Sequence, residues 1–161
     1  NPCSCGHYPD RSKCNCSPNQ VKRYLGKISR PLLDRIDICI ETLQVSYKDL
    51  KEKKVSETSK NIRERVMKVR EVQMQRYRNE NFNYNSQLTP KTISKYCKLG
   101  KEEQILIEKA FTKMNLSARA YHRILKVART IADLDSAENI NLKHLSEAIC
   151  YRSLDKKYWE E

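Results

Sequence analysis

The chain has 161 residues, of which 39% are hydrophobic and 32% are charged, with only three Gly and five Pro. This composition excludes fibrous and disordered proteins and indicates a soluble, helix-rich chain. The formal net charge of +12 favours a polyanionic partner such as nucleic acid or nucleotide phosphate, although a solvated basic surface without a partner has the same charge.

The sequence has no apolar run near the ~18 residues that a membrane span needs, and it shows no signal peptide. Its seven cysteines are an odd number, and Cys39, Cys97 and Cys150 occur singly in apolar patterns. Such usage is typical of a reducing compartment. We therefore expect a cytoplasmic protein with no membrane partner.

Residues 1–16 are polar and contain two C-x-C pairs, Cys3 with Cys5 and Cys14 with Cys16. Two close pairs of thiolates, separated by a loop that can fold back, suit a tetrahedral Zn2+ ion. Two disulfides, an iron–sulfur cluster or four free thiols are the alternatives. No carboxylate pair that could activate water is evident, so we favour a structural zinc ion whose binding stabilises the loop. His7 is a spare candidate ligand.

A short helix is expected in "SPNQVKRYLGKI", with Ser17 as its N-cap, Gln20 as the capping-box partner and Gly26 at its end. In residues 36–40, three isoleucines then alternate with Asp37 and Cys39. This period-2 pattern predicts a strand. One strand cannot form a sheet, so we expect its partners in another chain or in a part of the protein that is not present.

Residues 46–56 are a charged connector and the best candidate for a domain boundary. The following sequence indicates helices, of which the first, over 57–78, carries an apolar stripe on a strongly basic background. Apolar stripes on consecutive helices joined by short loops imply a small helical bundle. The other helices are expected after Thr89 with an end at Gly100, over 101–115, over 117–134, and after Asn141 with Leu142, Leu145 and Ile149 facing inward.

Several strings carry a family resemblance: "NPCSCGHYPD", "KCNCSPNQVKRYLGKISRPLLDRIDI", "LSARAYHRILKVARTIADL" and "HLSEAICYRSLD". They resemble the magnesium-chelatase-like AAA+ ATPases, the family of ComM and YifB. The resemblance covers nearly the whole chain and implies a mainly α fold. Residues 1–45 would be the C-terminal end of a truncated α/β ATPase core, with the cysteine loop and one orphan strand. Residues 46–56 would be a linker, and residues 57–161 would be the helical lid domain.

The resemblance also implies roles for single residues. Asn1 matches the sensor residue that orients the attacking water, and Arg35 in "LLDRIDI" matches the arginine finger that acts on the nucleotide of a neighbouring subunit. Arg119 matches the lid arginine that contacts the phosphate of ATP, and Arg123 lies one turn later and could share that role. Ordinary exposed surface positions are the alternative for Arg35 and Arg119.

The resemblance implies ATP and Mg2+ as cofactors of a full-length protein, which would assemble into a hexameric ring and move DNA branches during recombination. The chain contains no G-x-x-x-x-G-K-[ST] string, so we expect that it does not hydrolyse ATP alone. One alternative is a metal-chelatase-type ATPase subunit that remodels a protein partner. A non-enzymatic, zinc-containing helical module that binds nucleic acid is another.

Overall fold

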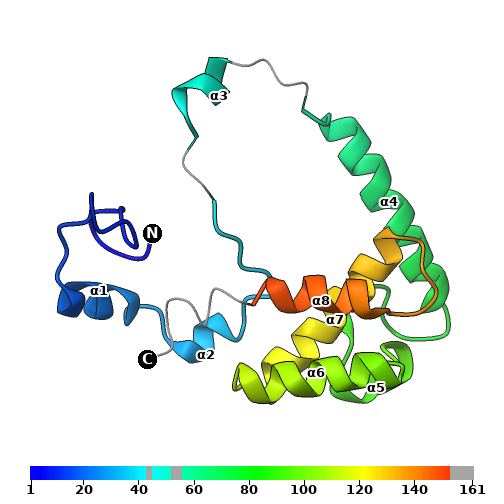
Figure 1. Ribbon diagram of the computed structural model, residues 1–161. Helices are drawn as coiled ribbons and strands as arrows, with labels where there is room; N and C mark the ends of the chain where they lie inside the picture. The colour runs from blue at the N-terminus through cyan, green and yellow to red at the C-terminus, as the bar shows by residue number, and fades with distance from the viewer. Residues whose placement is uncertain (43–44, 52–55, 153–161) are drawn as a thin grey trace. The chain divides into compact units, whose positions relative to one another are not determined.

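The computed structural model describes residues 1–42, 45–51 and 56–152 (Figure 1). The chain divides into two compact units, Asn1–Ile40 with the stretch from Tyr151 onward, and Glu41–Cys150. Residues 52–55 of the expected linker and residues 153–161 of the expected lid domain lie outside the described residues. All regular elements in the described part of the chain are helical, which confirms the predicted mainly α class.

The first unit begins with the cysteine-rich loop, which leads into helix α1 (Pro18–Leu25). The predicted capping box is present, since Ser17 Oγ accepts from the Gln20 N–H (3.3 Å) and Gln20 Oε1 accepts from the Ser17 N–H (2.8 Å). Gly26 ends the helix, as predicted. A small core joins the loop to the helix, and its buried members are Cys3, Cys14 and Val21, with Tyr8, Cys16 and Leu25 packed around them.

Helix α2 (Arg30–Leu33) is a single turn, and the strand predicted after it at 36–40 is wrong. No strand forms in the described residues, and Ile38 and Ile40 are 50% and 66% exposed. The Cys39 N–H donates to Tyr151 O at 3.0 Å. One such bond does not make a ladder, which needs repeated backbone pairing with a neighbouring strand. The alternating pattern is present in the sequence, but no neighbouring strand lies beside it in the described residues.

The second unit is a helical bundle centred on α7 (Ala118–Leu134), which packs against α4, α5, η1 and α8 (Figure 1). Ser117 caps α7 by accepting from the Ala120 N–H at 3.1 Å. The predicted inner face of α7 is confirmed, because Ile124, Leu125 and Ala128 are buried. The other helical elements of the unit are α3 (Tyr47–Lys51), α4 (Ser59–Arg76), η1 (Asn85–Gln87), α5 (Pro90–Tyr96), α6 (Lys101–Lys113) and α8 (Leu142–Cys150).

Two details of the helical bundle differ from the prediction. Gly100 is the N-cap of α6 and not the end of α5, which already stops at Tyr96. Leu142 does not face inward but is 38% exposed, because α8 packs against α7 and α6 through the face that carries His144 and Leu145. The neighbouring helices decide which face of a helix is buried, and the apolar pattern of α8 was compatible with two different buried faces.

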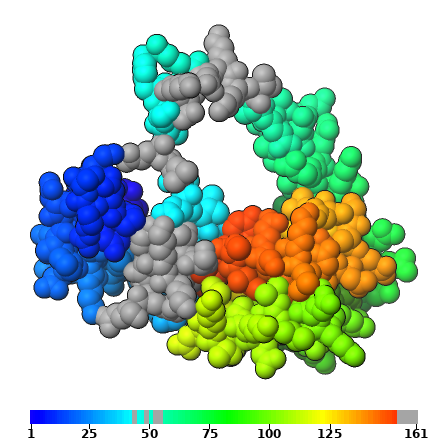
Figure 2. Space-filling model, in the orientation of Figure 1, coloured from blue at the N-terminus to red at the C-terminus, as the bar shows by residue number. Residues whose placement is uncertain are grey.

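Helix α4 is embedded only at its C-terminal end. Gln73 and the following Tyr77 are buried, whereas Ile62 and Val66 are 42% and 43% exposed. In Figures 1 and 2 the N-terminal turns of α4 extend beyond the body formed by α5 to α8. These turns present basic side chains to solvent, namely Lys60, Arg63, Lys68 and Arg70. None of the helices in the described residues is long and apolar enough to cross a lipid bilayer.

Candidate functional site

The four predicted cysteines converge in the first unit. The Sγ atom of Cys3 lies 3.3 Å from that of Cys5 and 3.8 Å from that of Cys14, and the Sγ atoms of Cys5 and Cys14 are 3.6 Å apart. With Cys16 included, all four sulfurs lie within 4.8 Å of one another. A tetrahedral zinc ion with Zn–S bonds of about 2.3 Å requires S···S distances of about 3.8 Å. The site therefore fits such an ion.

The same distances bear on the alternatives to a metal. A disulfide bond is about 2.05 Å long, and the three S···S distances among Cys3, Cys5 and Cys14 are all 3.3 Å or more. His7, the spare candidate ligand, is exposed and does not belong to the cluster. The donor set is thus four sulfurs, which is typical of structural zinc or of an iron–sulfur centre.

Local turns bring the two cysteine pairs together. Gly6 has a φ of +82°, a left-handed conformation that favours glycine, and its N–H donates to Cys3 O at 3.2 Å. At the far end of the loop, Asp10 Oδ1 accepts from the Ser12 N–H at 3.0 Å, while Asp10 O accepts from the Cys14 N–H at 2.9 Å. These bonds return the chain so that the second C-x-C pair faces the first.

The cluster distributes protons unevenly among its thiols. Burial raises the pKa of Cys3, but hydrogen bonds from the Tyr8 N–H and with Cys5 and Cys14 outweigh it and lower this pKa to about 6. For Cys14, the backbone bond at Cys16 lowers the pKa, but burial and the neighbouring Cys5 and Cys3 sulfurs raise it to about 11. The thiolate form of Cys3 is therefore stabilised, whereas the thiolate form of Cys14 is disfavoured. A bound cation would offset the repulsion between these thiolates.

The predicted finger, Arg35, lies just after the single turn of α2. Its backbone N–H donates to Leu32 O at 2.9 Å, and its Nη1 donates to Pro31 O at 2.8 Å. The residue is exposed. A guanidinium carries five N–H donors, so this contact leaves capacity for a second acceptor such as a phosphate oxygen. Asn1 belongs to the same unit and is also exposed.

The two predicted lid arginines lie on α7, in the second unit. Arg119 is exposed in the first turn of the helix, and Arg123 is half-buried one turn later, on the same side. The first turn of a helix presents unsatisfied N–H groups and a partial positive charge. A cationic side chain placed there adds to a field that attracts anions.

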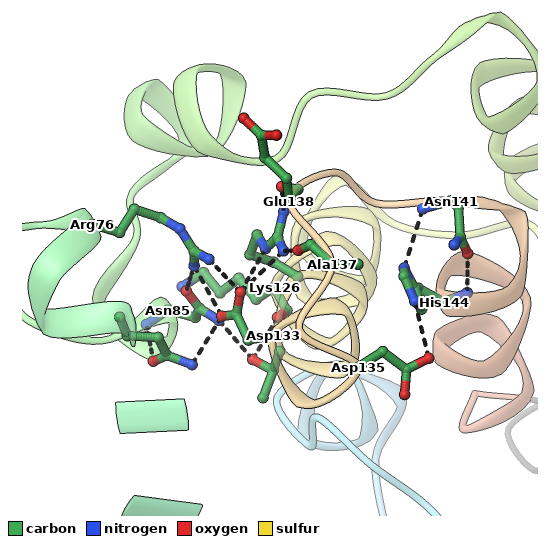
Figure 3. Close-up of polar contacts among 12 residues, drawn as sticks. Arg76, Asn85, Lys126, Asp133, Asp135, Ala137, Glu138, Asn141 and His144 are labelled. Atoms are coloured by element: carbon green, nitrogen blue, oxygen red, sulfur yellow. Dashed lines mark hydrogen bonds and ion pairs between the residues drawn. The ribbon is translucent and has the colours of Figure 1, made fainter. Parts of the chain in front are cut away.

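The polar core of the bundle was not predicted. The carboxylate of Asp133 is fully buried and accepts hydrogen bonds from four residues: from Gln73 Nε2 (3.2 Å), from Arg76 Nη1 (2.9 Å) and Nη2, from Asn85 Nδ2 (2.9 Å) and from Arg129 Nε (3.1 Å) (Figure 3). The donors come from α4, η1 and α7. This network joins the base of α4 to the central helix. The only signal in the sequence is the i,i+4 spacing of Arg129 and Asp133, which many surface pairs share.

Asn141, the predicted start of the last helix, forms a second polar group with His144 at the start of α8 (Figure 3). The Nδ1 of His144 accepts from the Asn141 N–H at 3.2 Å, and the His144 backbone N–H donates to Asn141 Oδ1 at 3.2 Å, which is a capping box with histidine in the place of Glu or Gln. The other ring nitrogen, Nε2, lies 3.3 Å from Asp135 Oδ2. His144 is buried and holds the helix start.

Residues 56–152 match the family model described as "Magnesium chelatase, subunit ChlI C-terminal", and residues 1–50 match "Magnesium chelatase, subunit ChlI". The chain belongs to the magnesium chelatase family. The chain is 44% identical to the competence protein ComM of Haemophilus influenzae over 155 residues. The aligned region covers 96% of this chain and 30% of that protein. Across 158 residues the chain is 38% identical to YifB of Escherichia coli, covering 97% of this chain and 30% of YifB.

The chain thus spans about 30% of the length of these curated relatives. The resemblance to magnesium-chelatase-like proteins, including ComM and YifB, is confirmed. Of the two matched segments, the N-terminal one contains the four cysteines and Arg35, and the C-terminal one contains Arg119 and Arg123.

Proposed function

We propose that the full-length protein is an AAA+ ATPase that assembles into a hexameric ring and moves branched DNA. The observation that carries this proposal is the 44% identity to a competence protein over 96% of the chain, within the magnesium chelatase family. The exposed arginines of the two units support it, because each is chemically suited to contact phosphate.

Arg35 is proposed as the arginine finger. A guanidinium that reaches the nucleotide of a neighbouring subunit neutralises charge on the transferring phosphoryl oxygens, and such fingers contribute about 10^3–10^5 in rate. A finger that acts on the next subunit requires a closed ring, which is the reason for proposing one. Arg119 is proposed to contact the phosphate of ATP in its own subunit, with Arg123 beside it, and Asn1 to orient the attacking water. ATP and Mg2+ are then the cofactors of the full-length protein.

DNA is the proposed substrate of the motor. The net charge of +12 and the exposed basic residues on the protruding turns of α4 support a contact with phosphates. Lys60 and Arg63 are exposed near the N-terminal end of α4, where a duplex can reach them. Such contacts release condensed counterions and make affinity fall steeply with salt.

The four-cysteine centre is proposed to hold Zn2+ in a structural role. Cys3 and Cys14 are buried against Val21 of α1, so an ion bound there would tie the N-terminal loop to the helix that precedes α2. The four candidate ligand atoms of the cluster are all sulfur, as in structural zinc sites. The ion would supply folding energy, because a structural zinc site does not exist in the unfolded chain.

A second candidate is favoured by the family model, whose description names a magnesium chelatase subunit. In that case the ATPase would remodel a protein partner and not DNA. Both candidates use the same arginines and differ in the substrate.

The deciding experiment compares ATP turnover and DNA binding of the full-length protein at several salt concentrations. The proposal predicts that branched DNA binds, that its affinity falls steeply between about 50 and 200 mM salt, and that it raises ATP turnover. ATP turnover with neither DNA binding nor DNA stimulation would instead support the protein-remodelling candidate. Absence of ATP turnover under every condition would contradict both.

A further inference from the structure

Arg152 is the largest fully buried side chain in the described residues, with 1% of its surface exposed. It follows α8 in sequence but belongs to the first unit. A buried guanidinium requires acceptors for its donors, because an unpaired buried charge is strongly destabilising. Its acceptors therefore show what the residue does.

Three acceptors of Arg152 within the described residues belong to the turn that carries Arg35. Arg152 Nη1 donates to Leu33 O at 3.2 Å and also to Ile36 O, while Nη2 lies 3.4 Å from Asp34 Oδ1. Arg35 lies between these residues in the sequence. The backbone on each side of it is thus held by one guanidinium. The neighbouring bond from the Cys39 N–H to Tyr151 O adds a second tie between the same two segments.

This support matters because α2 cannot maintain the turn alone. The helix has only four residues, and a single turn is far below the length at which an isolated helix is stable. Its last carbonyls also lack partners within the helix. A cation at the C-terminal end satisfies these carbonyls and complements the helix dipole. Without it, the direction in which Arg35 projects would be set by a weak turn.

We propose that Arg152 is a positioning residue for Arg35: it fixes the turn after α2 so that the exposed Arg35 guanidinium is presented to the nucleotide of the neighbouring subunit. This inference rests on the proposed finger role of Arg35. Arg152 itself is buried and does not touch nucleotide. It acts by restricting the backbone of residues 33–36, and a misplacement of about 1 Å at a catalytic group can lower a rate about 10^2-fold.

The test is a complementation experiment with the full-length protein. Arg35→Ala subunits keep their own nucleotide site but supply no finger, whereas Arg119→Ala subunits are defective at their own site and supply an intact finger. If Arg35 acts between subunits, a mixture of these two inactive proteins regains ATP turnover. If it does not, the proposed function of Arg35 is wrong, whatever Arg152 does.

Arg152→Ala is then mixed with Arg119→Ala in the same way. We expect Arg152→Ala alone to lower kcat about 10^2-fold with KM for ATP changed less than about twofold, and the mixture to regain turnover. Failure of this mixture, when the Arg35→Ala mixture succeeds, would overturn the inference. So would wild-type kcat in Arg152→Ala.

Two further variants keep the result interpretable. Arg152→Lys retains the buried charge but cannot bridge three acceptors as a planar guanidinium does, so it should fold and show the same loss of kcat and the same complementation. It replaces Arg152→Ala if that variant does not fold, and wild-type kcat in Arg152→Lys would then contradict the inference. Arg23→Ala, an exposed arginine on α1, is the matched control and should behave as wild type.

Discussion

Arg76 and Asp133 form an ion pair across 57 residues of sequence, with Nη1 of the arginine 2.9 Å from Oδ2 of the carboxylate. The carboxylate is fully buried, and the arginine side chain is 21% exposed. Hydrogen bonding to Asp133 raises the pKa of Arg76 above its usual value, so the arginine stays charged. The contact fixes the end of α4 on α7 and leaves the basic turns of α4 projecting from a rigid base.

Replacing Asp133 with Asn should strongly destabilise the helical bundle. The amide keeps the shape but removes the charge that compensates Arg76 and the buried Arg129. Removing one partner from a buried pair costs about 3–5 kcal/mol of unfolding free energy. Urea unfolding followed by circular dichroism measures this loss.

The matched control is an exposed pair between α4 and the residue that precedes its N-cap. Arg65 contacts Glu57 at 2.7 Å, but the two side chains are 53% and 40% exposed. Glu57→Gln should therefore change stability by about 1 kcal/mol or less. Equal effects of Asp133→Asn and Glu57→Gln would show that the Asp133 network does not hold the bundle.

Replacing Cys14 with Ser should abolish metal binding by the N-terminal loop. Cys14 Sγ lies within 3.8 Å of two other cluster sulfurs, so its loss leaves three ligands for a tetrahedral ion. Elemental analysis should find one zinc per wild-type chain and much less in the variant, while Cys150→Ser, outside the cluster, keeps its zinc. If elemental analysis finds iron and sulfide in the wild-type protein, the zinc assignment is wrong and the centre is an iron–sulfur cluster.

Stability should fall at alkaline pH through Cys97. Burial raises the pKa of this thiol from 9.0 to about 11, so the folded state holds its proton while the unfolded chain loses it. The resulting stability is complete below pH 9 and is lost as the pH rises to about 11, for a total of about 2–3 kcal/mol.

Comparison with Cys97→Ala isolates this contribution, because Tyr77, whose pKa burial raises to about 12, titrates in both proteins. Urea unfolding at pH 8 and pH 11 should show a smaller loss of stability in the variant than in wild type. If both proteins lost the same stability between pH 8 and pH 11, the Cys97 thiol would ionise equally easily in the folded and the unfolded state.

Removing basic residues from the protruding turns of α4 should weaken DNA binding by the full-length protein. If Lys60 and Arg63 each contact a phosphate, the double alanine variant lowers the magnitude of the slope of log K against log salt by about 1.8. Alanine favours helix, so α4 is retained. The same substitutions at Lys101 and Lys109 of α6 serve as the control, and an equal effect there would indicate non-specific attraction.

The helices were predictable because their ends carry local signals. Ser17, Thr89 and Ser117 each cap a helix in the structure, and the capping geometry depends only on residues within one turn. The four-cysteine centre was predictable for a similar reason, since its two pairs are joined by one short loop. Local chemistry is visible in the sequence.

The remaining features depend on distant partners. Isoleucines 36–40 alternate as a strand does, yet a strand forms only where another lies beside it. The contacts of Asp133 with α4 and of Arg152 with the α2 turn join segments 57 and more than 100 residues apart. A buried arginine and an exposed one look alike in a sequence, and only the fold separates Arg152 from Arg35.

If Arg35 is the arginine finger, its loss should stop ATP turnover by the full-length protein without removing ATP binding. We expect kcat of Arg35→Ala to fall about 10^3-fold or more, while its ATP affinity, measured by equilibrium binding, stays within about twofold of wild type. Arg23→Ala should leave both unchanged. Wild-type turnover in assembled Arg35→Ala rings would show that Arg35 is not the finger.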